Sequence, residues 1–188
     1  ELNRRSKWFS SGILYWMRND CWPALGWSVI DYYNEPKQVY YQQRKTYAPV
    51  LVSFSQNEKE ETCLFVANDT LNELNLNIRF GLKTLDGNVR WEKEKVIPVG
   101  QNGYYCEAVA VGRTAGDEYF YVEAYDRKGR RYHNLYSQLL WKDCKFESDY
   151  VVKKTLLNEC EMEVEITANK FAKSVFLSFE GNYQYAFS

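Results

Sequence analysis

From Pro49 onward the sequence alternates between apolar and polar side chains, and this period of two restricts the possible folds more than any other feature. In the clearest run, 74–82, leucine, isoleucine or phenylalanine occupies every second position. Such alternation is typical of a strand with one face in a core and the other in water. Similar runs occur at 50–55, 62–67, 88–97, 104–111, 118–125 and 134–141.

Turn signals separate these runs. Asp86-Gly87, Asn102-Gly103 and Lys128-Gly129 are dipeptides of the kind that favours tight turns. Seven short strands joined in this way are typical of an immunoglobulin-like antiparallel β-sandwich. The sequence has no Cys…Trp…Cys arrangement of the antibody type. It therefore predicts an immunoglobulin-like sandwich over residues 49–143 that is not a true antibody domain.

The first 48 residues follow a different pattern. The run 12–17, "GILYWM", is apolar without alternation, which indicates a strand covered on both faces, as in a parallel sheet. A helix is expected over 36–47, because Pro36 suits a helix start and Pro49 disfavours helix at the preceding residue. One strand and one helix cannot enclose a core. We therefore interpret residues 1–48 as the last strand–helix unit of a larger α/β domain.

A further change of pattern follows residue 143. Apolar and glutamate residues alternate over 161–166, and the run 173–179, "KSVFLSF", predicts a second strand. Two or three strands are too few for an independent fold. Residues 144–188 are therefore interpreted as a linker and the first strands of a further β-domain.

The charge and length of apolar runs exclude some classes of partner. The 24 Lys and Arg nearly balance the 25 Asp and Glu, and they are scattered along the chain. We therefore expect no nucleic-acid partner and no anionic membrane surface. No apolar run approaches the roughly 20 residues that cross a bilayer, and the N-terminal residues do not resemble a signal peptide. The chain as given is expected to be soluble and without a membrane segment.

Cysteine and histidine content argues against metal or cofactor chemistry. The five cysteines are odd in number and widely spaced, so we expect them to be mostly free and buried. His133 is the single histidine, which removes most metal and catalytic-triad schemes. No metal site and no cofactor are predicted.

Aromatic residues make up 17% of the chain, an excess that is often used in binding surfaces or between domains.

A family resemblance covers Gly12 to Phe54. This stretch contains the patterns G-x-L-x-W-x-x-N-D-x-W-P, W-S-x-x-D-Y-Y and P-K-x-x-Y-Y. It is similar to the end of the catalytic barrel of glycoside hydrolase family 2, most closely its β-mannosidase branch. The resemblance implies that 1–48 are strand 8 and helix 8 of a TIM barrel, 49–143 the sandwich that follows, and 144–188 the truncated start of a C-terminal β-domain.

The resemblance also implies a function. The chain would be a fragment of a retaining exo-β-glycosidase, a β-mannosidase, that hydrolyses terminal non-reducing β-linked sugars. Its partners would be a β-linked glycan, bound through the parent barrel, and the missing barrel itself. Any targeting signal would lie upstream, and bacterial relatives of this kind are often periplasmic or secreted.

Four residues are the candidate sugar-binding positions. Trp16 matches the family's tryptophan at the end of the last barrel strand, which lines the subsite of the cleaved sugar. Asn19 and Asp20 match the family's N-D pair, which could orient the site or hold the loop. Trp22 could contact sugar or pack within the loop.

The chain lacks the family's catalytic carboxylates. Retaining hydrolysis needs two carboxyl groups roughly 5–5.5 Å apart, and in the family both are glutamates on earlier strands. Glu1, Asp20, Asp31 and Glu35 match neither position. We therefore expect this polypeptide alone to be inactive.

Met17-Arg18 departs from the glutamine and leucine of many members. Methionine at this position also occurs in the related exo-β-glucosaminidase branch, so the substrate sugar stays open. Arg18 could contact a sugar hydroxyl or a uronate, or form a salt bridge in the barrel rim.

Alternative interpretations assign the sandwich another role. It could be a carbohydrate-binding module that exposes Tyr119, Tyr121 and Tyr125 on one face, or a purely structural module, in a family 2 glycosidase of the β-galactosidase or exo-β-glucosaminidase type. Exposure of that face distinguishes the two roles.

The triplet "NDT" at Asn68 matches the N-glycosylation pattern. Residues 1–48 are expected to fold back on the sandwich, pair with a second copy, or pack on the absent barrel.

Overall fold

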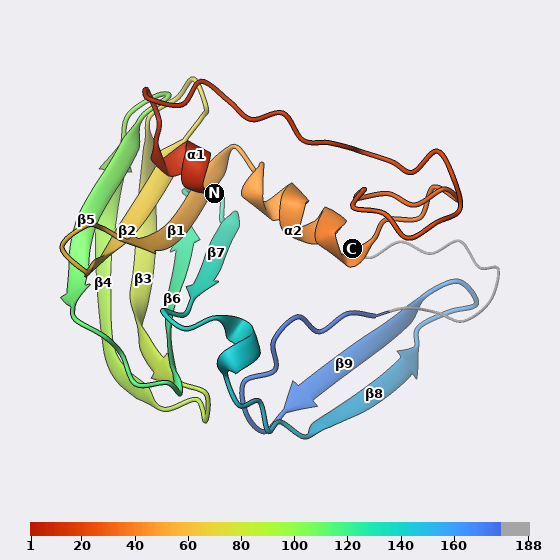
Figure 1. The fold of residues 1–188 in the computed structure, drawn as a ribbon. Helices are drawn as coiled ribbons and strands as arrows, with labels where there is room; N and C mark the ends of the chain where they lie inside the picture. The colour runs from red at the N-terminus through yellow and green to blue at the C-terminus, as the bar shows by residue number, and fades with distance from the viewer. Residues whose placement is uncertain (178–188) are drawn as a thin grey trace. The chain divides into compact units, whose positions relative to one another are not determined.

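The computed structural model describes residues 1–177, which form two compact units (Figure 1). The first unit is Glu1–Lys145, and the second begins at Phe146. The predicted boundary at 48/49 lies inside the first unit, and the assignment of residues 1–48 to a barrel end stays a prediction. No helix in residues 1–177 combines the length and apolarity needed to span a bilayer.

Two antiparallel sheets make up most of the first unit (Figure 1). The three-stranded sheet has the order β1-β2-β5, with β1 Val50–Gln56, β2 Glu61–Asn68 and β5 Tyr104–Val111. The four-stranded sheet has the order β4-β3-β6-β7, with β3 Leu74–Thr84, β4 Val89–Val99, β6 Glu118–Tyr125 and β7 Arg131–Tyr136. The mainly β, antiparallel sandwich is therefore confirmed. The last strand was expected at 134–141, but it begins earlier and is followed by a short 3-10 helix at Trp141–Asp143.

The core lies between the two sheets because the apolar members of each alternating run face inward. Leu76, Ile78 and Phe80 of β3 are fully buried, as are Leu64 and Val66 of β2. Burying each of these side chains contributes about 1.5–3 kcal/mol. The period of two in the sequence is thus the period of the core.

The predicted turns form where their dipeptides indicated. Gly87 and Gly129 have φ angles of 90° and 76°, which glycine adopts without steric cost. Asn102 has a φ of 46°, and asparagine tolerates this left-handed region better than most residues.

Residues 1–48 form two helices and a long irregular connection. The helices are α1, Leu2–Arg5, and α2, Gln38–Thr46. The helix expected over 36–47 is therefore confirmed, whereas the strand expected at 12–17 is absent. A strand buried on both faces needs a hydrogen-bonding neighbour, and the described chain places none beside these residues.

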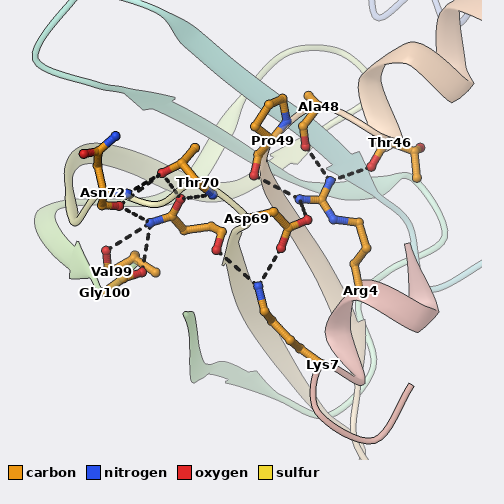
Figure 2. A network of polar contacts seen from close by, with 11 residues as sticks. Arg4, Lys7, Thr46, Ala48, Pro49, Asp69, Thr70, Asn72, Val99 and Gly100 are labelled. Atoms are coloured by element: carbon orange, nitrogen blue, oxygen red, sulfur yellow. Dashed lines mark hydrogen bonds and ion pairs between the residues drawn. The ribbon is translucent and has the colours of Figure 1, made fainter. Parts of the chain in front are cut away.

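Arg4 fastens the N-terminal segment to the start of the sandwich (Figure 2). Its guanidinium donates hydrogen bonds to the carbonyl oxygens of Thr46 and Ala48, both at 2.6 Å, and of Pro49 at 3.2 Å. These are carbonyls at the end of α2 and in the link to β1, which the helix itself leaves without donors. A single side chain therefore closes the C-terminal end of α2.

Asp69, in the turn after β2, completes this joint (Figure 2). Its carboxylate lies 2.9 Å from Arg4 Nη2 and 2.6 Å from Lys7 Nζ. Farther back, the Glu1 carboxylate accepts a hydrogen bond from Asn134 Nδ2 at 2.9 Å. Residues 1–7 thus fold back on the sandwich, one of the three outcomes expected for residues 1–48.

Asn68 of the glycosylation triplet is fully buried. Its Nδ2 donates to the carbonyl oxygens of Asn72 at 2.8 Å and Gly100 at 2.9 Å, and its Oδ1 accepts from Thr70 Oγ1 at 2.7 Å. The amide nitrogen that a glycan would occupy is therefore used inside the fold, and the triplet is not a glycosylation site in this folded chain.

The described part of the second unit contains one hairpin. It consists of β8, Tyr150–Leu156, and β9, Met162–Ala168. β9 agrees with the predicted alternation, whereas β8 was not predicted because "YVVKKTL" lacks a regular polar and apolar alternation. Of the strand expected over 173–179, residues 173–177 are not in a strand, and the remainder lies outside the described residues.

All five cysteines are free, as expected, but their burial differs from the expectation. Cys63 and Cys144 are buried, whereas Cys21, Cys106 and Cys160 are exposed. The exposed three lie in the loop after residue 20, on the outer side of β5 and in the β8–β9 turn, where the side chain has no core to enter.

Candidate functional site

The segment that carries the candidate site residues is folded back on itself. The carbonyl oxygen of Arg18 accepts hydrogen bonds from the amides of Val29 and Ile30, both at 3.0 Å. The amide of Asp20 in turn donates to the Ile30 carbonyl at 3.0 Å. Residues 18–20 therefore lie alongside residues 29–30, with an isolated parallel bridge between Asn19 and Ile30.

Lys37 joins the two sides of this loop. Its Nζ lies 2.6 Å from Asp20 Oδ2, 2.8 Å from Ser28 Oγ and 3.1 Å from the Gly26 carbonyl oxygen. We call Asp20, Gly26, Ser28 and Lys37 the Lys37 cluster. Three hydrogen-bond acceptors from three parts of the loop thus meet at one ammonium group.

Asp20 is the buried member of the Lys37 cluster, with 7% of its surface exposed. The hydrogen bond from Lys37 and, after it, the nearby Ser28 hydroxyl hold the pKa of its carboxyl below the usual range. Buried carboxylates are stable only when they are paired and hydrogen-bonded. Asp20 therefore holds the loop as an anion.

The remaining three candidate residues face outward. Trp16 is 80% exposed and Trp22 is 74% exposed, and Asn19 is also exposed. No ring contact or side-chain hydrogen bond joins the three within residues 1–177. The peptide bond between Trp16 and Met17 is cis. The structure thus separates Asp20, whose carboxylate is bonded within the loop, from Trp16 and Trp22, whose indoles are exposed.

Sequence reasoning missed Lys37 and Ser28 as partners of Asp20. Both residues stand inside the quoted motifs, in P-K-x-x-Y-Y and W-S-x-x-D-Y-Y. The only indication in the sequence was that Lys37 and Ser28 are polar residues within motifs rich in aromatic residues. The spacing within the motifs does not show that Lys37, Ser28 and Asp20 lie together.

Two of the other three candidate carboxylates of the first 48 residues, Asp31 and Glu1, also have structural partners. Asp31 Oδ1 accepts hydrogen bonds from the amides of Tyr33 at 2.9 Å and Glu35 at 2.8 Å, which closes its own turn. Glu1 pairs with Arg5 at 3.2 Å. Within the described residues no group of three or more His, Cys, Asp or Glu side chains is arranged to hold a metal.

The tyrosine face proposed for glycan binding is largely covered. Tyr119 is 7% exposed and Tyr121 5% exposed, and only Tyr125 reaches 37%. Lys83 Nζ lies 4.1 Å from the centre of the Tyr121 ring, and the Tyr121 hydroxyl donates to Glu92. The carbohydrate-binding alternative required three tyrosines exposed in a row, and this condition is not met, because Tyr119 and Tyr121 are buried.

Comparison with known proteins gives local sequence matches to two kinds of glycosidase. β-Mannosidase B of Thermothelomyces thermophilus is 40% identical over 48 residues, which are 26% of this chain and 6% of that protein. An exo-β-D-glucosaminidase of Amycolatopsis orientalis is 30% identical over 109 residues, which are 57% of this chain and 10% of that protein. The matched regions are therefore a tenth or less of these relatives. No family model matches the chain.

Solved structures extend the likeness over most of the chain. A β-D-mannosidase from Dictyoglomus thermophilum aligns with a TM-score of 0.76 and 25% identity, covering 89% of this chain and 21% of that one. The exo-chitosanase of Amycolatopsis orientalis aligns with a TM-score of 0.60 at 20% identity, over 91% of this chain and 24% of that one, and so supports the fold alone. These matches confirm the resemblance inferred from residues 12–54.

Proposed function

We propose that this chain, which resembles the C-terminal part of glycoside hydrolase family 2 enzymes and is closest to their β-mannosidase branch, completes the sugar-binding surface of a retaining exo-β-glycosidase. The parent enzyme hydrolyses terminal non-reducing β-linked sugars. The chain contributes the end of the catalytic barrel and the sandwich that follows it.

The observation that carries this proposal is the contrast within the loop 15–37. The carboxylate of Asp20 is bound to Lys37, whereas the indoles of Trp16 and Trp22 are exposed. A pyranose has an apolar face of C–H groups, and a flat aromatic ring covers that face while polar groups bind its hydroxyls. In a barrel of this kind the ligand lies at the carboxyl ends of the strands, where Trp16 would lie. Trp16 is the proposed sugar contact, and Asn19 and Trp22 are secondary ones.

The catalytic carboxyl groups belong to the parent barrel. Hydrolysis with retention needs an acid/base and a nucleophile roughly 5–5.5 Å apart. In this chain Glu1, Asp20 and Asp31 are occupied by structural hydrogen bonds, and Glu35 matches neither catalytic position of the resembled family. The proposal is therefore that the chain alone does not hydrolyse.

The missing barrel is the proposed partner of the exposed apolar residues before and within the loop. Leu14 and Leu25 are fully exposed, and Ile13 is more than half exposed. Adjacent apolar side chains with no cover are typical of a surface that another part of the protein buries.

β-Mannoside is the first choice of substrate because the resemblance is closest to that branch. A β-glucosaminide is the second choice, because the exo-β-glucosaminidase branch also carries methionine at the position of Met17. In a second candidate role, the sandwich is only a structural module, and the burial of Tyr119 and Tyr121 favours that role over glycan binding on the same face.

The test is a chimeric enzyme in which this chain replaces the matching segment of the Dictyoglomus β-mannosidase. We expect hydrolysis of aryl β-mannoside by the chimera and none by the 188-residue chain alone. Trp16→Ala should lower kcat/KM at least about tenfold, which corresponds to about 1.4 kcal/mol of transition-state stabilisation. Aryl β-glucosaminide and β-galactoside, assayed in parallel, decide the sugar.

Trp8→Ala is the matched control, since Trp8 is 70% exposed and lies outside the loop. Its kcat/KM should equal that of the unchanged chimera. Hydrolysis by the chain alone, or a Trp16→Ala chimera with unchanged kcat/KM, would contradict the proposal.

A further inference from the structure

Lys37 binds both sides of the loop, and its presence in the pattern P-K-x-x-Y-Y does not by itself explain these contacts. Its ammonium contacts Asp20 on the first side of the loop, and Gly26 and Ser28 on the second. Its own amide donates to the Val29 carbonyl at 3.0 Å, so its backbone is also tied to the second side. Lys37 immediately precedes α2 and is its N-cap residue.

We propose that Lys37 is a positioning residue that fixes the direction of Trp16 by holding the two sides of the loop together. It does not touch the sugar. The Asp20 carboxylate, nearly buried, requires a cation in this place, and Lys37 is the residue that supplies it.

The route from Lys37 to Trp16 consists of hydrogen bonds on the same segment. The Lys37 cluster fixes Asp20, and the amides of Val29 and Ile30 fix the Arg18 carbonyl two residues after Trp16. On the other side of Trp16, the Tyr15 hydroxyl donates to the Trp27 carbonyl at 2.5 Å. Trp16 therefore lies between two residues, Tyr15 and Arg18, that are both hydrogen-bonded to the segment 27–30 on the other side of the loop.

The backbone at Gly26 lies close to the Asp20 carboxylate, which leaves no room for a side chain at this position. A Cβ added at Gly26 would lie 2.6 Å from Asp20 Oδ1, much closer than real side chains approach. Any larger residue would force the Asp20 side chain to shift within the cluster. This contact offers a way to disturb the cluster without removing a charge.

The test uses the 188-residue chain with 5-fluorotryptophan in place of its six tryptophans and observes their ¹⁹F resonances. Single Trp→Phe changes assign the signals. In Lys37→Met we expect the signals of Trp16 and Trp22 to shift or broaden, and that of Trp91, which packs against the sandwich core, to stay in place. Lys37→Arg keeps the positive charge and should restore the native positions in part.

Two further variants complete the test. Gly26→Ala should move the Trp16 signal as Lys37→Met does, whereas Gly12→Ala, where a Cβ meets nothing within 4 Å, should not. Lys59→Met, the same substitution in the exposed turn between β1 and β2, should leave all six signals unchanged. Unchanged Trp16 signals in Lys37→Met would overturn the proposal, and so would equal changes at Trp91, because these would make Lys37 a general stabilising residue.

The effect of Lys37 on sugar binding rests on the proposed function, whereas its effect on Trp16 does not. In the chimera, Lys37→Met should raise KM and lower kcat/KM by about tenfold to hundredfold, with partial rescue by Lys37→Arg. A chimera that is inactive even without substitutions would count against the proposed function, while the ¹⁹F spectra would still decide the role of Lys37. An active chimera whose KM and kcat are unchanged by Lys37→Met would overturn the positioning of the sugar contact.

Discussion

Single side chains in this molecule are committed to its internal hydrogen bonds in ways that their sequence context does not reveal. Asn68 stands in a glycosylation triplet, yet its amide joins the end of β2 to the carbonyls of Asn72 and Gly100 and is bonded by Thr70. Asp20 stands next to the candidate sugar contact, yet its carboxylate binds Lys37. Both residues stabilise loops because every polar atom that they bury has a partner.

Asn68→Ala should therefore destabilise the sandwich. The change removes the donor to the carbonyl oxygens of Asn72, Val99 and Gly100 and the acceptor for Thr70, so buried and partly buried groups lose their partners. We expect the free energy of unfolding to fall by about 2–3 kcal/mol, measured by urea denaturation. Asn72→Ala is the control, because Asn72 contributes only its backbone amide and carbonyl to these hydrogen bonds and should change this value by less than about 0.5 kcal/mol. Equal losses in the two variants would contradict this account of Asn68.

At the residue scale the sequence offered candidates for the site and not their contacts. Trp16, Asn19 and Trp22 could be named because they lie in the motif that resembles the glycosidase family, and their contact with sugar stays a prediction. Lys37 and Ser28 could not be chosen as partners of Asp20, since they lie 17 and eight residues away from it and their meeting depends on how the loop returns. Residue types and spacing do not encode that path.

Among the elements, strands were predicted best where burial on one face imposes a period of two. β3 is the clearest case, because its inward side chains form the centre of the core. β7 was displaced and β8 was missed, since neither has a regular alternation. The run 12–17 was predicted as a strand from its apolar character, but strand formation needs neighbouring strands that a sequence pattern cannot supply.

At the scale of elements, Arg4 connects α1, α2 and β1 (Figure 2). Arg4→Ala should leave the carbonyls of Thr46 and Ala48 without their donor and Asp69 with one fewer cation. We expect a loss of about 2–4 kcal/mol in the free energy of unfolding. Hydrogen exchange should also become faster at the end of α2. Arg44→Ala, an exposed arginine in the last turn of α2, is the control, and a loss equal to that of Arg4→Ala would contradict the joint.

Over the whole molecule, the segments bonded to the sandwich differ from the segment whose apolar side chains are exposed. Residues 1–7 and α2 are tied to the sandwich by Glu1, Arg4 and Lys7, whereas the loop between them leaves its tryptophans and leucines uncovered. A sandwich that holds both ends of a loop with exposed aromatic rings fits the proposal that the chain completes a site built elsewhere. In this region the carboxylates of Glu1, Asp20 and Asp31 make structural hydrogen bonds.

The most direct measurement of the central claim is the site of covalent labelling in an active chimera. A retaining glycosidase forms a glycosyl–enzyme intermediate on its nucleophile, and a 2-deoxy-2-fluoro-mannosyl fluoride traps it for peptide mass analysis. We predict a single labelled carboxylate in the part of the chimera that comes from the Dictyoglomus enzyme. We predict no label within residues 1–188 of this chain. A label on Glu1, Asp20, Asp31 or Glu35 would contradict the account, because it would place the nucleophile in this chain.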